Sequence, residues 1–157
     1  MTNRRTGNID YNCAVAKGDL FEELTCIWKG VKILSKENDC YNGPLDHSRD
    51  LTLGLLYQTK GKLYDPIDKS WKQSWKNEHN KEFDYIISYC TSKDGKIIER
   101  IYIFPKEEVV KRSGITIVKN PTKIRYVEQW YEKYRIKDEN MINNVNRIWK
   151  EILKEKR

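Results

Sequence analysis

An aspartate, a glutamine and a lysine in the first half of the chain are spaced so that they could act together. Asp46 lies twelve positions before Gln58, and Lys60 follows Gln58 by two residues at the end of an apolar run. If this run is a β-strand, Gln58 and Lys60 point to the same face, because side chains alternate along a strand. A carboxylate, an amide oxygen and an ammonium group would then converge on one site.

These three groups suit the metal-assisted hydrolysis of a phosphodiester bond. Mg²⁺ prefers hard oxygen ligands and keeps positions open for water and phosphate. Asp46 would supply an anionic ligand, and Gln58 a neutral carbonyl oxygen. Lys60 would orient or help to deprotonate the attacking water, and it would balance the charge that grows on the phosphorus oxygens.

The periodicity of apolar residues predicts the elements that must position this site. Apolar side chains at three- and four-residue spacing predict a helix over residues 14–29, with Gly30 as its stop. Short apolar runs bounded by turn residues predict strands, and Asp94-Gly95 predicts a hairpin turn. The predicted strands cover residues 53–59, 83–90, 97–104 and 115–118, and the hairpin turn joins the second to the third.

The order of these elements indicates the fold class. Residues 106–111 can form one or two helical turns, and the region from about 123 to 157 is predicted to be helical. Trp71 and Trp75, four residues apart among lysines, fit either a helix face packed on the core or a basic wall beside DNA, and core packing is favoured. We therefore predict an α/β fold with a central mixed β-sheet flanked by helices, in a single domain over residues 1–157.

Composition favours a reduced, nucleic-acid-binding protein. Thirty Lys and Arg residues against 23 Asp and Glu residues give a formal charge of +7. This charge suits a polyanionic partner, but it also fits an AT-rich genome, whose codons favour lysine. The four cysteines form no CxxC pair, so reduced thiols in a cytoplasmic protein are expected. No apolar run has the length of a membrane span. Two histidines, His47 and His79, are too few for a histidine-metal nuclease.

The order of motifs resembles the PD-(D/E)xK, or restriction-endonuclease-like, nuclease superfamily. Many of its members place a glutamate on an early helix after a Gly-x-x-Phe start, and residues 17–22, KGDLFE, have this form, with Glu22 at the matching position. Asp46 corresponds to the metal-binding aspartate, and Gln58-Thr59-Lys60 to the acidic-x-Lys triplet. Gln58 replaces the commoner Asp or Glu, a variant found among some homing endonucleases.

The resemblance implies a restriction-endonuclease-like fold and a site that contains Glu22, Asp46, Gln58 and Lys60. Glu22, Asp46 and Gln58 would bind Mg²⁺, which Mn²⁺ can replace. Asp50 competes with Asp46 as the metal ligand, because some members place the aspartate nearer to the triplet; Glu23 competes with Glu22 in the same way. The implied function is site-specific cleavage of double-stranded DNA, by a homodimer if one site cuts one strand.

Two other functions fit the same residues. The neutral Gln58 together with the positive charge also fits a catalytically inactive nucleic-acid-binding module, for which metal would be irrelevant. A resolvase that cuts branched DNA at Holliday junctions is the third hypothesis. Loops around residues 61–82 and the basic C-terminal region are the expected DNA contacts.

Overall fold

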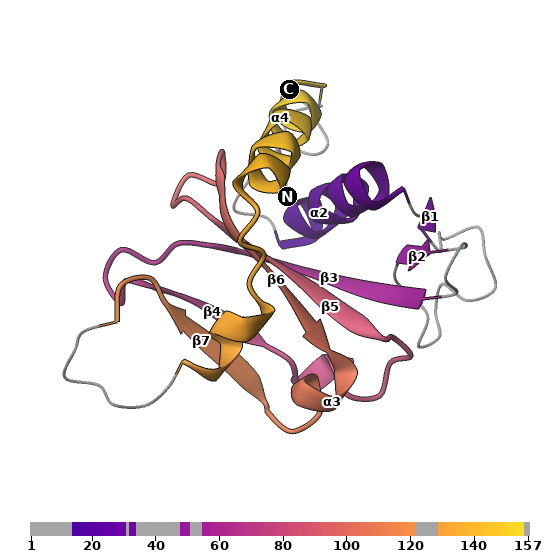
Figure 1. Cartoon of the computed structure of the whole chain (residues 1–157), viewed down its shortest axis with the longest axis vertical. Coiled ribbons are helices and arrows are strands. Elements are labelled where there is room, and N and C mark those ends of the chain that lie inside the picture. The colour runs from indigo at the N-terminus through magenta and orange to yellow at the C-terminus, as the bar shows by residue number, and fades with distance from the viewer. Residues whose placement is uncertain (1–13, 31, 34–47, 51–54, 122–128, 156–157) are drawn as a thin grey trace.

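A computed structural model of the chain describes residues 14–30, 32–33, 48–50, 55–121 and 129–155, and the side chains of 20–30, 55–121 and 129–155. Its centre is a five-stranded mixed sheet in the order β1-β2-β3-β5-β6 (Figure 1). β3 and β5 are parallel, and the other neighbours are antiparallel. The strands are β1 (Lys32–Ile33), β2 (Ser48–Asp50), β3 (Leu55–Leu63), β5 (Tyr85–Thr91) and β6 (Ile98–Pro105).

A second, smaller sheet lies against one face of the main sheet. It consists of the antiparallel pair β4 (Ser70–Ser74) and β7 (Gly114–Val118). The short helices η1 (Lys76–Glu78), α3 (Lys106–Val109) and η2 (Trp130–Tyr134) connect or border these strands. The two long helices, α2 (Ala14–Lys29) and α4 (Glu139–Glu155), lie on the other side of the main sheet, so the molecule has three layers (Figure 1).

The layer of long helices is held by one apolar core. Phe21 of α2 stacks between Tyr89 of β5 and Trp149 of α4, with ring centroids 5.4 and 4.8 Å away. Asp138 accepts hydrogen bonds from the amides of Asn140 and Met141 and so caps the start of α4. Asn146 exchanges two hydrogen bonds with the backbone of Ile98 at the start of β6. α4 is therefore fixed to the sheet by polar as well as apolar contacts.

Close packing of α2 on β3 depends on Gly61. A Cβ atom at this position would lie 2.0 Å from the ring of Phe21. Phe21 cannot swing away, because its ring is stacked between two other aromatic rings. Any larger residue at position 61 would therefore push the helix away from the strand that carries Gln58 and Lys60.

The other face of the sheet has a second, largely aromatic core. Trp71 and Trp75 of the β4 region, both 0% exposed, pack with Phe104 and Tyr102 of β6 and with residues of β7, α3 and η2. The indole of Trp71 donates a 2.7 Å hydrogen bond to the Thr91 carbonyl. Trp75 packs edge-on against Phe104. This core holds the small sheet onto the main sheet.

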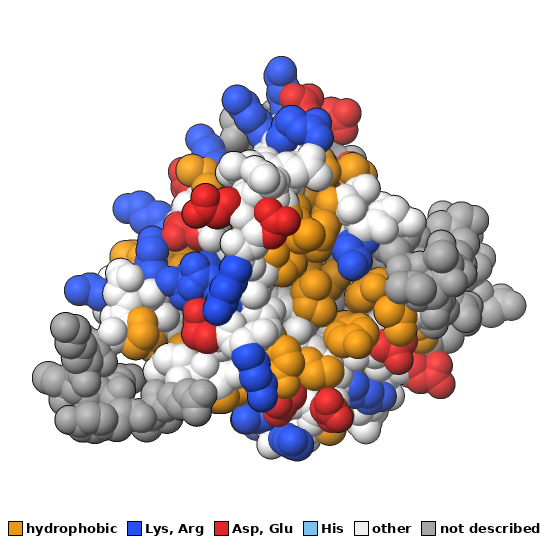
Figure 2. Space-filling model, in the orientation of Figure 1, with side chains coloured by type: hydrophobic (Ala, Val, Ile, Leu, Met, Phe, Trp, Pro, Cys, Tyr) orange, Lys and Arg blue, Asp and Glu red, His pale blue; other side chains and the backbone are white. Residues whose placement is uncertain are grey.

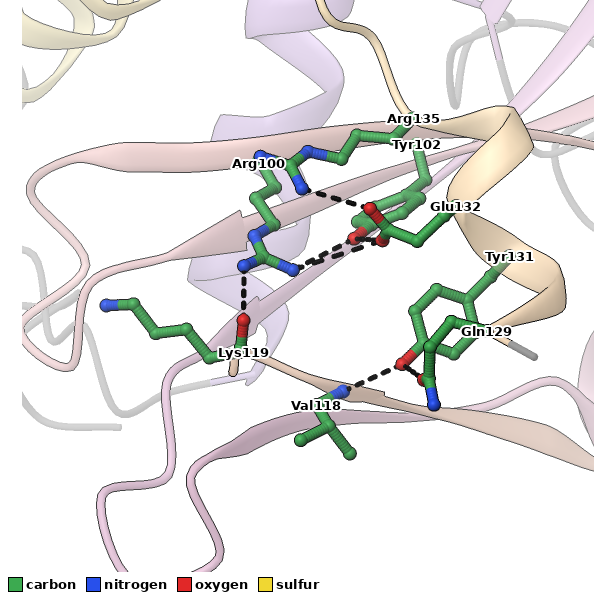
Figure 3. A network of polar contacts seen from close by, with 8 residues as sticks. All are labelled: Arg100, Tyr102, Val118, Lys119, Gln129, Tyr131, Glu132 and Arg135. Carbon is green, nitrogen blue, oxygen red and sulfur yellow. Dashed lines mark hydrogen bonds and ion pairs between the residues drawn. The ribbon is translucent and has the colours of Figure 1, made fainter. Parts of the chain in front are cut away.

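A polar network ties η2 and the end of β7 to β6 (Figure 3). Glu132 accepts hydrogen bonds from the Tyr102 hydroxyl (2.6 Å) and from Arg135 (3.0 Å). Arg100 donates a 2.6 Å hydrogen bond to the carbonyl of Lys119, just after β7. Tyr131 of η2 accepts a hydrogen bond from the Val118 amide. The segments on either side of residues 122–128 are thus joined through β6.

Most of the predicted architecture is confirmed. The first helix, the hairpin at Gly95 (φ +77°), the short turn of helix after β6 and the helical C-terminus are all present, and Gly30 ends α2 with φ +69°. The fold is an α/β arrangement with a central mixed sheet flanked by helices, as expected. Strands β2 and β4 were not predicted; the tryptophans do pack in the core, but from β4 and the residue that follows it. Among the described residues no helix is long and apolar enough to cross a membrane.

Candidate functional site

Strand β3 presents Gln58 and Lys60 to the side of the small sheet. In the parallel register Gln58 lies opposite Ile86, and Lys60 lies opposite Ser88. Ile86 belongs to the aromatic core under the small sheet, and register partners point to the same face. Tyr57, in contrast, belongs to the core under the long helices. The prediction that Gln58 and Lys60 share a face is therefore confirmed, and the face is the one opposite α2.

Lys60 is paired with a buried carboxylate that comes from η1. Its Nζ lies 2.8 Å from Oε2 of Glu78, and the two side chains are 30% and 3% exposed. The other carboxylate oxygen, Oε1, lies 3.4 Å from Nζ of Lys81. Oε1 accepts no hydrogen bond from a described residue, so the contact with Lys81 is an ion pair without good hydrogen-bond geometry. Burying a carboxylate is costly unless it is paired, and here Lys60 makes the short contact.

Polar side chains continue from Lys60 across the sheet. Ser88, the fully buried register partner of Lys60 on β5, donates a 2.8 Å hydrogen bond to Oε1 of Gln73 on β4. The Nε2 atom of Gln73 is buried and has no hydrogen-bond partner among the described residues. Buried amides are nearly always satisfied in folded proteins, so this donor marks a place where a ligand or water would be accommodated.

Together these residues form a continuous feature, which we call the polar strip: Gln58, Lys60, Lys62, Gln73, Glu78 and Ser88. It lies on the same face as the aromatic core but toward β3 rather than β6. Buried polar groups on this part of the face take the place of apolar side chains that would pack more favourably. Such a departure from apolar packing is typical of functional sites. The strip combines three hydrogen-bonding side chains with two lysines and one carboxylate, a set suited to holding and polarising a phosphate.

Cys90 is not a nucleophile of this site. Cys90 lies on β5 and is fully buried, and burial raises the pKa of its thiol well above the usual range. A thiol in that state remains protonated and unreactive. Cys90 forms no disulfide, as expected for this residue from the spacing of the cysteines.

The structure places the other predicted site residues differently. Glu22 is half-buried on α2, the helix that covers the opposite face of the main sheet and contacts β1, β2 and β3. Asp50 is the last residue of β2, paired in register with Leu55 at the start of β3, and its side chain lies outside the described set. Asp46 lies outside the described residues altogether. Only Gln58 and Lys60 are thus brought together by the described geometry.

Four residues of the polar strip were not predicted as site residues from the sequence: Lys62, Gln73, Glu78 and Ser88. Glu78 stands in the polar segment between β4 and β5 and has no apolar periodicity around it, so nothing in the sequence indicates that it is buried. Gln73 alternates with Trp71 and Trp75, and this two-residue alternation is a strand signal that could have indicated its inward orientation.

The donor chemistry of the predicted metal site fits a hard divalent cation. Gln58 is 5% exposed and offers an amide oxygen, and the carboxylate of Asp46, or of Asp50 as its alternative, would supply charge that Mg²⁺ or Mn²⁺ requires. Within the described part of the chain, no three His, Cys, Asp or Glu residues cluster as a metal site. Asp46, the predicted aspartate ligand, lies outside those residues.

Comparison with known proteins finds similarity at the level of structure. No family model matches, and no curated protein matches. A solved structure, that of the bacterial homing endonuclease I-Ssp6803I, is similar with a TM-score of 0.53 and 17% sequence identity. The similarity covers 91% of this chain and 93% of the other. At this identity the likeness is one of fold, and it extends over nearly the whole of both chains.

Proposed function

We propose that this protein is a metal-dependent endonuclease that hydrolyses phosphodiester bonds in double-stranded DNA, of the restriction or homing type. The observation that supports it most is the placement of Gln58 and Lys60 side by side on one face of β3, with Lys60 held by a buried carboxylate. The whole-chain likeness in fold to a bacterial homing endonuclease agrees with this proposal, although a fold by itself does not assign an activity.

The metal would be held by oxygen ligands at the start of β3. Gln58 and Asp46 are the proposed ligands, with Asp50 as the alternative to Asp46 and Mg²⁺ or Mn²⁺ as the ion; Glu22 is on the helix that covers the opposite face of the sheet. Bound there, the ion would polarise the phosphate and lower the pKa of a coordinated water. Because Gln58 is neutral, the carboxylates contributed from elsewhere carry the charge that attracts the ion.

Lys60 would act on the phosphate and on the attacking water. Its ammonium group lies on the same face as Gln58 and is partly exposed, so it can contact a phosphate placed beside Gln58. A positive charge held there stabilises the charge that develops on the phosphate oxygens during attack. It also orients a water molecule through its N–H groups.

Glu78 would be a positioning residue for this lysine. In the family pattern that this chain resembles, the residue two positions before the lysine is acidic; here it is Gln58. Glu78 supplies a negative charge next to Lys60 from another element. It restricts the lysine to one place on the sheet without itself needing to contact the substrate.

Cleavage of both strands would require two copies of the site. One compact site cuts one strand, and a homodimer with two-fold symmetry is the simplest arrangement that presents a second site to the other strand. The dimer is therefore part of the proposal.

Metal-dependent cleavage tests the proposed function directly. Purified protein is incubated with duplex DNA in Mg²⁺, in Mn²⁺ and in EDTA, and the products are resolved by gel. The proposal predicts products with either metal and none in EDTA. Salt-dependent binding without products under any condition would instead identify an inactive DNA-binding module.

A further inference from the structure

A basic groove continues from the polar strip along the outside of the small sheet. Its volume is about 620 Å³, and it is lined by β3, β4, β7 and the turns that flank them. Three lysines (Lys62, Lys72 and Lys76) and three hydroxyl side chains (Ser74, Ser113 and Thr116) line it, and all six are exposed. None of the described lining residues is acidic. A surface of ammonium and hydroxyl donors without carboxylates is complementary to phosphate.

The backbone of the small sheet sets these donors in a row. Along β4, Trp71 and Gln73 face the protein while Lys72 and Ser74 face solvent, and Thr116 of β7 is the register partner of Lys72. Alternate residues of a strand are about 6.6 Å apart. The row is rigid, because the inward-facing tryptophan is fully buried. The groove is thus built on a fixed strand pair and not on long loops.

The groove is continuous with the proposed catalytic lysine. Lys62 follows Lys60 by two residues, and both lie on the face of β3 turned to the small sheet. Alternate residues of a strand are about 6.6 Å apart, a step close to the spacing of neighbouring phosphates along one strand of DNA, so the two lysines can contact adjacent phosphates. A phosphate beside Lys60 would place its neighbours along the same strand near Lys62 and the groove.

We propose that this groove binds the sugar-phosphate backbone of the DNA strand next to the cleaved bond. The inference rests on the proposed function and adds the surface that holds the substrate. Three lysines that face phosphates contribute affinity without reading sequence. Basic side chains also gather on α4 (Figure 2), but that helix covers the other face of the main sheet, away from Lys60.

One lysine of the groove is already paired with an acidic side chain. Asp68 forms an ion pair with Lys72 across one turn of the β3–β4 connection. Its carboxylate competes with phosphate for that ammonium group. Removal of Asp68 should therefore strengthen the binding of DNA, whereas removal of the lysines should weaken it.

The salt dependence of DNA binding tests the groove. Binding of a duplex is measured by fluorescence anisotropy in EDTA at several salt concentrations. The slope of log K against log salt is negative, and each lost phosphate contact reduces its magnitude by about 0.9 for duplex DNA. The triple variant Lys62→Ala/Lys72→Ala/Lys76→Ala is expected to lose about 2 to 3 units of slope. Asp68→Asn is expected to bind about two- to fivefold more tightly, from the competition of one exposed ion pair.

A matched triple variant on the other side of the molecule is the control. Lys93→Ala/Lys150→Ala/Lys154→Ala removes the same charge from exposed lysines of the β5–β6 turn and α4, and its slope should equal that of the parent. The inference is overturned by a groove variant that keeps the parental slope, or by a control variant whose slope falls as much as that of the groove variant. In either case, cleavage by the parent leaves the proposed function intact. A parent that neither binds nor cuts DNA overturns both.

Discussion

Glu78 gives Lys60 a fixed place at the level of single residues. A carboxylate that is 3% exposed has lost nearly all of its hydration. The free-energy cost of this desolvation is offset only by a close, well-oriented positive charge. Lys60 at 2.8 Å provides that charge, and Lys81 at 3.4 Å adds a weaker contact. The pair is therefore expected to be coupled energetically, whether or not DNA is present.

A double-mutant cycle measures this coupling without an activity assay. Lys60→Met and Glu78→Gln are made singly and together, and unfolding free energies are obtained from urea titrations. Each single variant leaves the other group without its main partner, so both should be destabilising, with a coupling energy of about 1 to 3 kcal/mol.

The exposed pair Lys72–Asp68 is the matched control for that cycle. Its side chains are 55% and 46% exposed, and its coupling should be much weaker because solvent screens it. Equal coupling in the two pairs would show that Glu78 does not hold Lys60 more firmly than an ordinary surface contact does.

At the level of elements, the network around η2 carries a pH-dependent part of the stability. Burial by itself raises the pKa of Glu132, but hydrogen bonds from Tyr102 and Arg135 and the charges of Arg135 and Arg100 outweigh it, so the pKa of this carboxyl is lowered. A carboxyl with a lowered folded-state pKa stabilises the fold above its unfolded pKa. That contribution is lost as the pH falls through the folded value.

Glu132→Gln tests this network. The variant should unfold more easily than the parent at neutral pH, and the difference should be smaller at strongly acidic pH, because the parental carboxyl becomes protonated as the pH falls through its lowered folded-state pKa. Urea titrations at both pH values measure it. Glu151→Gln, at an exposed position on α4, should change stability little at either pH. A difference between Glu132→Gln and the parent that stays constant with pH would contradict the role of the charge.

Elements whose signal is local could be predicted from the sequence, whereas those that depend on distant partners could not. The long helices and the β5–β6 hairpin have clear periodicity or a turn dipeptide, and they appear where expected. Strand β4 was missed because Trp71 and Trp75, four residues apart, satisfy both a helical and a two-residue period. Its partner, β7, lies more than forty residues later, and only that pairing decides between the two.

At the level of the whole molecule, the main sheet separates the core of the long helices from the face that carries the proposed site. The long helices lie on one side and the small sheet on the other (Figure 1). The polar strip and the basic groove are on the side of the small sheet. The shared face of Gln58 and Lys60 was predictable, because alternation along one strand fixes it. The burial of Glu78 was not, since it arises from the docking of the segment after β4 against β3. The helix of Glu22 lies on the other side of the sheet, which no spacing in the sequence indicates.

The rate of DNA cleavage by Lys60→Ala tests the central claim most directly. It is measured under single-turnover conditions in Mg²⁺, with Lys137→Ala, an exposed lysine between η2 and α4, as the matched control. The account predicts a loss of about 10²- to 10³-fold for Lys60→Ala, because a charge positioned on the reacting phosphate is removed, and a parental rate for Lys137→Ala. Cleavage by Lys60→Ala at the parental rate would contradict it.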